Sequence, residues 1–106
     1  MAINPKPRRV ELLWQALQQI KPNYEQPFEI GYEAAKAASL VERYGDADYY
    51  KVLEQDIRWL ENTDKAIEEV VNERAANLPG YTPSYRLTFE GRQMLFDAGK
   101  PIDPMR

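Results

Sequence analysis

A stripe of four polar side chains carries the most chemistry that this sequence offers. It lies within residues 46–62 and consists of Lys51, Gln55, Arg58 and Asn62. At about 100° per residue these four positions fall on one face of a helix. Their donors and acceptors are those that DNA base edges and phosphates require. The same residue types also occur on ordinary solvated helix surfaces, so both interpretations stay open.

Further basic side chains are candidates for contacts with nucleic acid. Arg8 and Arg9, together with Lys6, form a small basic N-terminal arm. Such arms can touch phosphates or enter a minor groove, although more of them are solubilising charges ahead of a helix. Arg74 and Arg86 lie on a predicted hairpin, where they would meet the DNA backbone.

Several large apolar residues are candidates for a partner interface. Trp59 and Val52 make an apolar patch beside the polar stripe. They either pack on the first or second helix or anchor a partner, because an exposed Trp is typical of binding hot spots. The apolar residues of the terminal helices supply a candidate homodimer interface, consisting of Trp14, Leu17, Met94 and Phe96.

Catalytic and metal-binding chemistry has little support in the sequence. The chain has no Cys and no His, which removes thiolate chemistry, the commonest general base and the usual transition-metal ligand. The acidic pairs Asp46/Asp48 and Glu68/Glu69 lack the glycine and spaced oxygens of a calcium loop. The five glycines are scattered singly, so no phosphate-binding loop exists. We expect no enzyme activity, no cofactor and no metal.

The charge distribution supports a second interpretation. The net charge is −3, which argues against binding nucleic acid through bulk charge. Between Asp46 and Glu73 nine acidic residues stand against three basic ones. This acidic band suits a protein-interaction module that binds a basic partner or imitates the charge of DNA.

No segment of the sequence is suited to a membrane. Residues Met1 to Arg9 are polar and lack the apolar stretch of a signal peptide. No apolar run approaches the ~20 residues of a membrane span. We therefore expect a cytoplasmic protein without a membrane partner.

Periodicity and breakers predict the elements that must position these residues. Apolar residues at helical spacing predict a helix over Pro7–Ile20. Alternation over Asn23–Gly31 predicts a short extended segment. An alanine-rich helix over Gly31–Tyr44, stopped by Gly45, is followed by a third helix that Asp46 or Asp48 caps and that ends near Asn62.

The second half of the chain predicts a hairpin and a last helix. Residues Ala66–Arg74 suit either a strand or a continued helix, and Leu78–Ser84 must be a loop. Tyr85–Thr88 reads as a short strand, after which Thr88 caps a helix that ends at Gly99.

We expect a single domain over residues 1–106, with an ordered core of about 7–99 and flexible tails at 1–6 and 100–106. On the third helix Tyr50, Leu53, Ile57 and Leu60 should face inward, with Asp56 at the edge of that face. The residues expected to be nearly buried are Leu13, Leu17, Leu53, Ile57, Leu60 and Leu87.

Two stretches resemble the winged helix-turn-helix superfamily. Tyr85-Arg-Leu-Thr-Phe-Glu-Gly91 is similar to the Y-x-L-T-x-E-G pattern at the return strand of bacterial winged-helix proteins, and Asp56-Ile-Arg-Trp-Leu60 resembles the end of their third helix. The resemblance covers roughly Pro7 to Gly99. It implies a mainly helical fold with a small β-hairpin, in the order helix, strand, helix, helix, hairpin, helix. It also implies a small DNA-binding transcriptional regulator that uses the third helix and a wing. We expect a dimer, because a single module of this size buries only ~600–1,000 Å² on DNA.

The chain departs from this superfamily after the third helix. A glycine often follows that helix, whereas this chain has Asn62-Thr63-Asp64-Lys65. The wing, counted from Asn62 to Ser84, would also be long.

Overall fold

The first helix begins where the sequence predicts it. The structure is a computed structural model that describes residues 6–71 and 82–103, and α1 spans Lys6–Leu17. Leu13, Ala16 and Leu17 are fully buried, so α1 has one apolar face. Successive tight turns then carry the chain onward, and the helix ends three residues before the predicted Ile20.

The helix predicted over Gly31–Tyr44 is divided in two. α2 spans Tyr32–Ala37 and α3 spans Leu40–Tyr44. Between them Ser39 has a φ of 66°, in the left-handed region that interrupts a right-handed helix. The break allows Leu40, which is 1% exposed, to enter the core. Helix propensity alone therefore predicted too long an element.

Gly45 ends α3 as expected, with a φ of 86° and its N–H donating to the carbonyl of Val41. The next helix, α4, spans Tyr49–Asn62. Asp48 occupies its N-cap position, but no side chain caps the helix. The predicted capping by Asp46 or Asp48 is therefore wrong, since the Asp48 carboxylate lies 3.6 Å from the Lys51 ammonium instead.

The connection after α4 explains the missing glycine. Lys65 has a φ of 53°, the left-handed conformation that glycine adopts without strain. The N–H of Ala66 then donates to the carbonyl of Leu60, which closes the turn. The backbone conformation is thus one that favours glycine, while the side chain is lysine.

A two-stranded antiparallel hairpin follows. β1 spans Ile67–Val70 and β2 spans Ser84–Leu87, with Ile67 opposite Leu87 and Glu68 opposite Arg86. The sequence from Ala66 suited either a strand or a continued helix, and the structure shows a strand from Ile67. Residues 72–81, including Arg74 and most of the predicted loop, lie outside the described part of the chain.

The segment before α2 joins the hairpin at one residue. Phe28 pairs with Tyr85 and exchanges two backbone hydrogen bonds with it, of 2.8 and 2.7 Å. Because Tyr85 also stands opposite Glu69 of β1, the Phe28 segment lies along the other edge of β2. The predicted extended segment is thus reduced to a single bridge.

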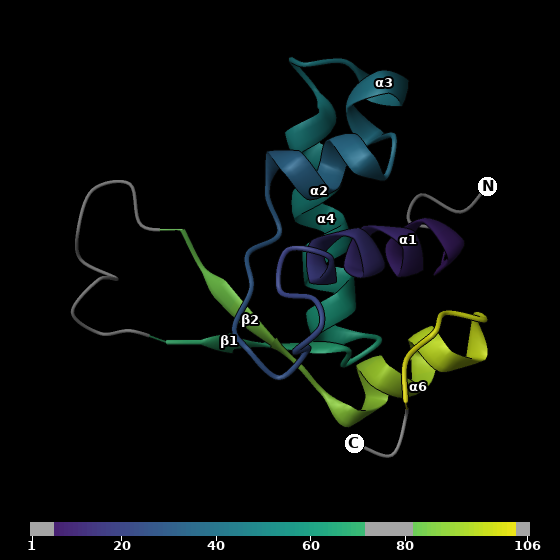
Figure 1. The fold of residues 1–106 in the computed structure, drawn as a ribbon. Helices are drawn as coiled ribbons and strands as arrows, with labels where there is room; N and C mark the ends of the chain where they lie inside the picture. The colour runs from purple at the N-terminus through teal and green to yellow at the C-terminus, as the bar shows by residue number, and fades with distance from the viewer. Residues whose placement is uncertain (1–5, 72–81, 104–106) are drawn as a thin grey trace.

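Five helices and one hairpin make up the described residues, which confirms the predicted mainly helical α+β class. In Figure 1 the hairpin extends away from the layer formed by α1, α2, α3 and α4, and α1 crosses α4. The last helix, α6, spans Phe89–Asp97 and lies beside α1 near the end of the chain.

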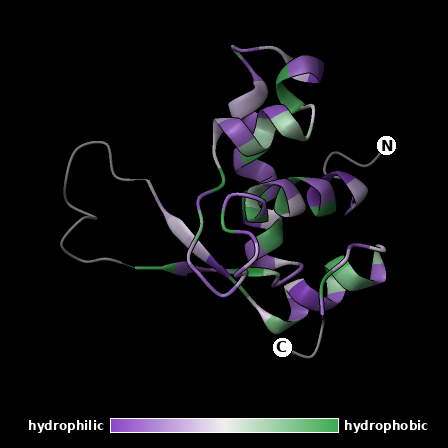
Figure 2. Cartoon of the chain, viewed as in Figure 1, coloured by the Kyte–Doolittle hydropathy of each residue, from purple (hydrophilic) through white to green (hydrophobic). Residues whose placement is uncertain are grey.

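The core lies where these elements meet, and Figure 2 shows hydrophobic residues, in green, on several of the helices that form it. Five of the six residues predicted to be buried are 9% exposed or less: Leu13, Leu17, Leu53, Leu60 and Leu87. The sixth, Ile57, is only partly buried. Ile57 is not fully buried because α4 turns Asp56 inward to meet Arg8.

The segment after α6 is packed, contrary to the predicted tail from residue 100. The Lys100 ammonium lies 2.7 Å from the Glu11 carboxylate of α1, and the hydrogen bond from Lys100 lowers the pKa of Glu11. Ile102 is buried in the core. An apolar side chain and an ion pair therefore hold residues 100–103, while residues 1–5 and 104–106 are outside the described residues.

Thr88 joins the hairpin to α6. Its hydroxyl accepts from the N–H of Gly91 at 3.0 Å and donates to the carbonyl of Lys65, so the predicted cap is confirmed. Gly91 lies against the base of the hairpin: a Cβ there would collide with the carbonyl oxygen of Ala66, just before β1, and lie 2.7 Å from Leu87 Cδ1 of β2. The Thr88–Gly91 pattern therefore fixes how α6 leaves the sheet.

We predict that Gly91→Ala lowers the free energy of unfolding by about 1–3 kcal/mol, the usual cost of overpacking a rigid site. The colliding atom belongs to the backbone and cannot move aside as a side chain would. Urea denaturation followed by circular dichroism measures the loss.

Gly31→Ala is the matched control. A Cβ at Gly31 meets nothing within 4 Å, and Gly31 does not have a positive φ. Its cost should stay below about 1 kcal/mol. Equal costs at the two glycines would contradict the close approach of α6 to Ala66 and Leu87.

Candidate functional site

The polar stripe of α4 lies on the surface as the sequence predicts. All four of its residues, Lys51, Gln55, Arg58 and Asn62, are exposed. The Lys51–Asp48 pair at 3.6 Å is between side chains that are 64% and 66% exposed, so it constrains Lys51 weakly. Within residues 6–71 and 82–103, Arg58 takes part in no ion pair. The stripe is thus available to a partner.

Carboxylates accompany this stripe. Glu54 is exposed and Glu61 is partly buried, and both border a hollow together with Arg58. The remaining walls come from α4, from the segment before α2, and from β2 with the two residues before it: Ile57, Ile30, Thr82, Pro83 and Tyr85. The outer side of α4 therefore has two cations, two carboxylates and an adjoining, largely apolar hollow.

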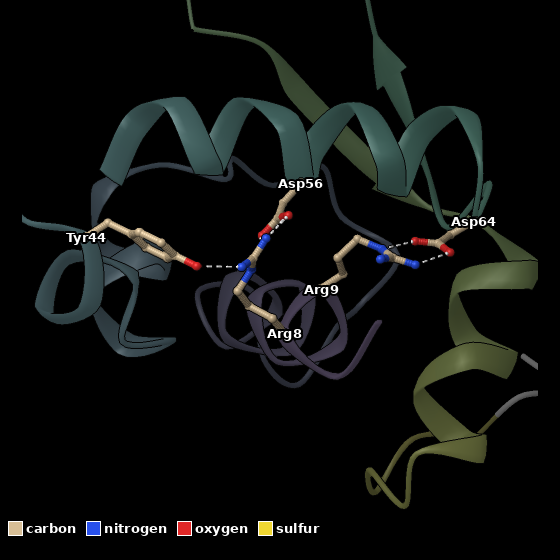
Figure 3. Close-up of polar contacts among 5 residues, drawn as sticks. All are labelled: Arg8, Arg9, Tyr44, Asp56 and Asp64. Atoms are coloured by element: carbon tan, nitrogen blue, oxygen red, sulfur yellow. Dashed lines mark hydrogen bonds and ion pairs between the residues drawn. The ribbon is translucent and has the colours of Figure 1, made fainter. Parts of the chain in front are cut away.

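A buried ion pair determines which side of α4 faces outward (Figure 3). Arg8 of α1 donates two hydrogen bonds to Asp56 of α4, one from Nε to Oδ2 at 2.9 Å and one from Nη2 to Oδ1 at 2.8 Å. Its Nη1 donates to the Tyr44 hydroxyl at 2.8 Å. The Asp56 side chain is fully buried and that of Arg8 is 8% exposed. The hydrogen bond to Asp56 raises the pKa of the Arg8 guanidinium.

The pair corrects the predicted orientation of α4. The sequence pattern turns Tyr50 and Ile57 inward and leaves Asp56 at the edge of the inner face. In the structure Asp56 is fully buried, Tyr50 is 46% exposed and Ile57 is only partly buried. Because Arg8 draws Asp56 toward α1, the helix is rotated away from the orientation that its apolar residues alone would favour.

A second arginine, Arg9, forms an ion pair just after the end of α4. Arg9 donates from Nε to Asp64 Oδ2 at 2.7 Å and from Nη2 to Asp64 Oδ1 at 3.0 Å. Its guanidinium also lies 5.3 Å from the ring centroid of Trp59, within the range of a cation–π contact. Figure 3 shows both arginines reaching from α1 toward the facing helix and its end.

These pairs overturn the predicted basic arm. Arg8 and Arg9 belong to α1, and their side chains are 8% and 6% exposed. Asp56 and Asp64 hold the two guanidinium groups inside the protein. There a DNA phosphate could not reach them. Neither arginine can therefore serve as a DNA-binding residue on the surface. Lys6 alone of this group is exposed.

The candidate interface residues do not form one surface. Leu17 is fully buried and Met94 is 8% exposed, because both belong to the core, so their assignment to a dimer interface is wrong. Trp14 is partly buried, with its ring centroid 5.8 Å from that of Tyr24. Trp59 and Phe96 remain accessible, at 41% and 51% exposed.

Arg86 is not brought together with the α4 stripe. Its neighbours Tyr85 and Leu87 are buried while Arg86 is exposed, so by strand alternation it points to the other face of the hairpin. Tyr85 borders the hollow beside α4, whereas Arg86 borders a different hollow beside α6. Arg86 therefore lies exposed on the predicted hairpin, but it borders a different hollow from the α4 stripe.

Sequence reasoning missed an aromatic cluster at the start of α4. The ring centroids of Tyr32 and Tyr49 are 5.6 Å apart, and those of Tyr49 and Tyr50 are 6.4 Å apart. Tyr32 and Tyr50 are 44% and 46% exposed. The pattern of apolar residues could not reveal this cluster, because Tyr50 was assigned to the core.

The part of the chain that the structure describes contains no group of three or more acidic side chains arranged to hold a metal ion. Among its helices, none is both long and apolar enough to cross a bilayer. The acidic pair Glu68/Glu69 lies on β1 with both side chains exposed.

We predict that Asp56→Asn lowers the free energy of unfolding by about 3–5 kcal/mol, because it leaves the Arg8 guanidinium buried without a counter-charge. Replacing both partners, as Arg8→Met with Asp56→Leu, should recover most of this loss. Urea denaturation of the single and double variants measures both effects.

Lys100→Met serves as the control, since it breaks an ion pair whose side chains are 24% and 39% exposed. It should cost no more than about 1 kcal/mol. If Asp56→Asn lowered the free energy of unfolding no more than Lys100→Met does, the structural role assigned to the Arg8–Asp56 ion pair would be contradicted.

Comparisons with protein-family models, with curated proteins and with solved structures found no match to this chain. The similarity to the winged-helix superfamily therefore stays a prediction from the sequence pattern.

Proposed function

We propose that this chain is a winged-helix domain that binds double-stranded DNA through the outer side of α4. The order of elements supports the proposal: a helix, a paired extended segment, helices, the long α4 and a hairpin follow one another. The pairing of Phe28 with one edge of β2 and of β1 with the other also fits this arrangement. Lys65 supplies the left-handed turn after α4 that the superfamily often assigns to glycine.

The exposed polar stripe of α4 is the observation that carries the proposal. Its four residues recur at intervals of four, three and four, so they follow one side of the helix. A helix of this length spans roughly 21 Å, and its diameter of about 10–12 Å fits the ~12 Å width of a major groove. Arg58 has the fork of donors that pairs with guanine, and Gln55 and Asn62 have the amides that pair with adenine.

The balance of charge on α4 sets the expected mode of binding. Lys51 and Arg58 are its exposed cations, and Glu54 and Glu61 offset them. Few phosphates can therefore be neutralised, and the salt dependence of binding should be shallow. A single module covers only ~600–1,000 Å² on DNA, so useful affinity calls for two copies.

A protein partner is the second candidate, and the acidity of the same region favours it. Between Asp46 and Glu69, six carboxylates remain when Asp56 and Asp64 are set aside as partners of Arg8 and Arg9. Three basic residues stand against them. The hollow beside α4, with Glu54 and Glu61 at its rim and Ile57 in its wall, suits a basic and partly apolar peptide.

We predict that a fluorescent random DNA duplex binds the protein at a salt concentration of about 50 mM and dissociates as salt rises. Arg58→Ala should weaken binding to a selected sequence by ~1–3 kcal/mol, because a bidentate base contact is lost. Glu54→Gln should tighten binding, since it removes a carboxylate that repels the phosphates. Fluorescence anisotropy measures each effect.

Lys21→Ala is the control, because it removes the same charge as Arg58→Ala from an exposed site outside α4. It should leave affinity for DNA nearly unchanged. Absence of DNA binding at low salt, combined with binding of a lysine-rich peptide that Glu54→Gln weakens, would replace the DNA proposal with the protein partner.

A further inference from the structure

Arg92 of α6 differs from the other two buried arginines. It is 8% exposed, comparable to the side chains of Arg8 and Arg9. Those two each hold a carboxylate with two hydrogen bonds, whereas Arg92 makes no ion pair with any residue in the ranges 6–71 and 82–103. Its one side-chain hydrogen bond in these ranges runs from Nη1 to the carbonyl of Asp103 at 3.3 Å. Among the residues that the structure describes, Arg92 is thus a buried cation without a matching anion.

The remaining donors of Arg92 open onto a hollow. Among the described residues no fully buried side-chain nitrogen lacks a hydrogen-bond partner, so the unbonded nitrogens of Arg92 reach accessible space. Arg92 lines two hollows, one beside Asn23 and Tyr24 and one that it shares with Arg86. Two guanidinium groups therefore border a single hollow, at the end of β2 and the start of α6.

We propose that this hollow binds a small oxyanion, a carboxylate or a phosphate, between Arg86 and Arg92. Guanidinium groups hold both kinds of anion with paired, charge-assisted hydrogen bonds. A buried cation without a partner is unfavourable, so an anion that reaches Arg92 gains a strong electrostatic interaction. Arg86, which is exposed, adds a second donor group at the entrance.

The other walls of the hollow define the ligand further. Leu87 and the 60% exposed Phe89 give it an apolar side, which suits an anion attached to a carbon skeleton. Glu25 borders the same hollow and opposes a negative ligand. Its carboxylate is exposed and lies in no ion pair with another described residue, so it weakens the site without closing it.

The site is independent of the DNA proposal. Arg86 points to the face of the hairpin opposite Tyr85, and Tyr85 borders the hollow beside α4. Substitutions at Arg86 therefore leave the α4 stripe intact. Failure of anion binding would not bear on DNA binding, and the reverse also holds.

Titration of the full chain with inorganic phosphate, acetate or benzoate, followed by NMR, tests the proposal. We expect saturable shifts of the Arg86 and Arg92 Nε–H signals and of neighbouring amides. Benzoate should bind more tightly than acetate, because its ring can contact Phe89. Comparison of phosphate with acetate identifies which oxyanion the site prefers.

Arg86→Gln should weaken binding roughly ten- to hundredfold, the equivalent of a lost charge-assisted hydrogen bond. Glu25→Gln should strengthen it. Arg43→Gln is the matched control, because Arg43 is an exposed arginine of α3 outside this hollow. It should leave affinity unchanged.

Arg86 and Glu25 are exposed, so these variants should stay folded even where Arg92→Gln does not. Two results would overturn the site. One is the absence of saturable shifts up to roughly 50 mM of every anion, well above a millimolar Kd. The other is an equal loss of affinity in Arg86→Gln and Arg43→Gln, which would reveal general attraction by surface charge.

Discussion

The Arg8–Asp56 ion pair is the contact on which the orientation of α1 against α4 depends. Removing both groups from water costs several kcal/mol per ion, roughly, and only close, well-directed hydrogen bonds offset this cost. Arg8 makes two such bonds with Asp56 and a third with the Tyr44 hydroxyl of α3, so one side chain joins three helices. Apolar contacts between two helices tolerate small slides and rotations, whereas a bidentate pair does not. The pair therefore fixes the rotation of α4 as well as its distance from α1.

Arg9 adds a second fixed point. Neighbouring residues on a helix diverge by about 100°, so Arg8 and Arg9 cannot reach the same place. Arg8 meets the middle of α4, while Arg9 meets Asp64 just beyond its end. Two points along one helix axis define its direction, which a single pair could not do. The same two pairs remove two cations from the surface and leave α4 with nearly balanced charge.

Local signals predicted much of the fold, and distant partners decided the rest. The apolar period of α1, the Thr88 cap and the stop at Gly45 depend on residues within a few positions of each other. Asp56 was misplaced because charged residues in an amphipathic pattern are assigned to solvent, and its partner lies 48 positions away. The break at Ser39 was missed for a related reason, since helix propensity carries no information about the burial of Leu40.

On α4 the polar stripe could be predicted, because its exposure follows from helical period alone. The burial of Arg92 could not, because it depends on a short segment that returns over α6.

The two faces of the hairpin present different chemistry. On the side of α4, Lys51 and Arg58 are matched by Glu54 and Glu61, so the proposed DNA binding there would depend on hydrogen-bond geometry and shape. On the other side, Arg86 and the buried Arg92 border a hollow whose lining includes one carboxylate, Glu25, while Glu68 of β1 stands opposite Arg86. Burial lowers the local dielectric constant, and an ionic attraction is stronger there than on the open surface of α4. Alternation along β2 keeps the two chemistries apart, because Tyr85 and Arg86 point to opposite faces. The proposed anion site therefore lies beside α6, away from the helix that would contact DNA in the proposed function.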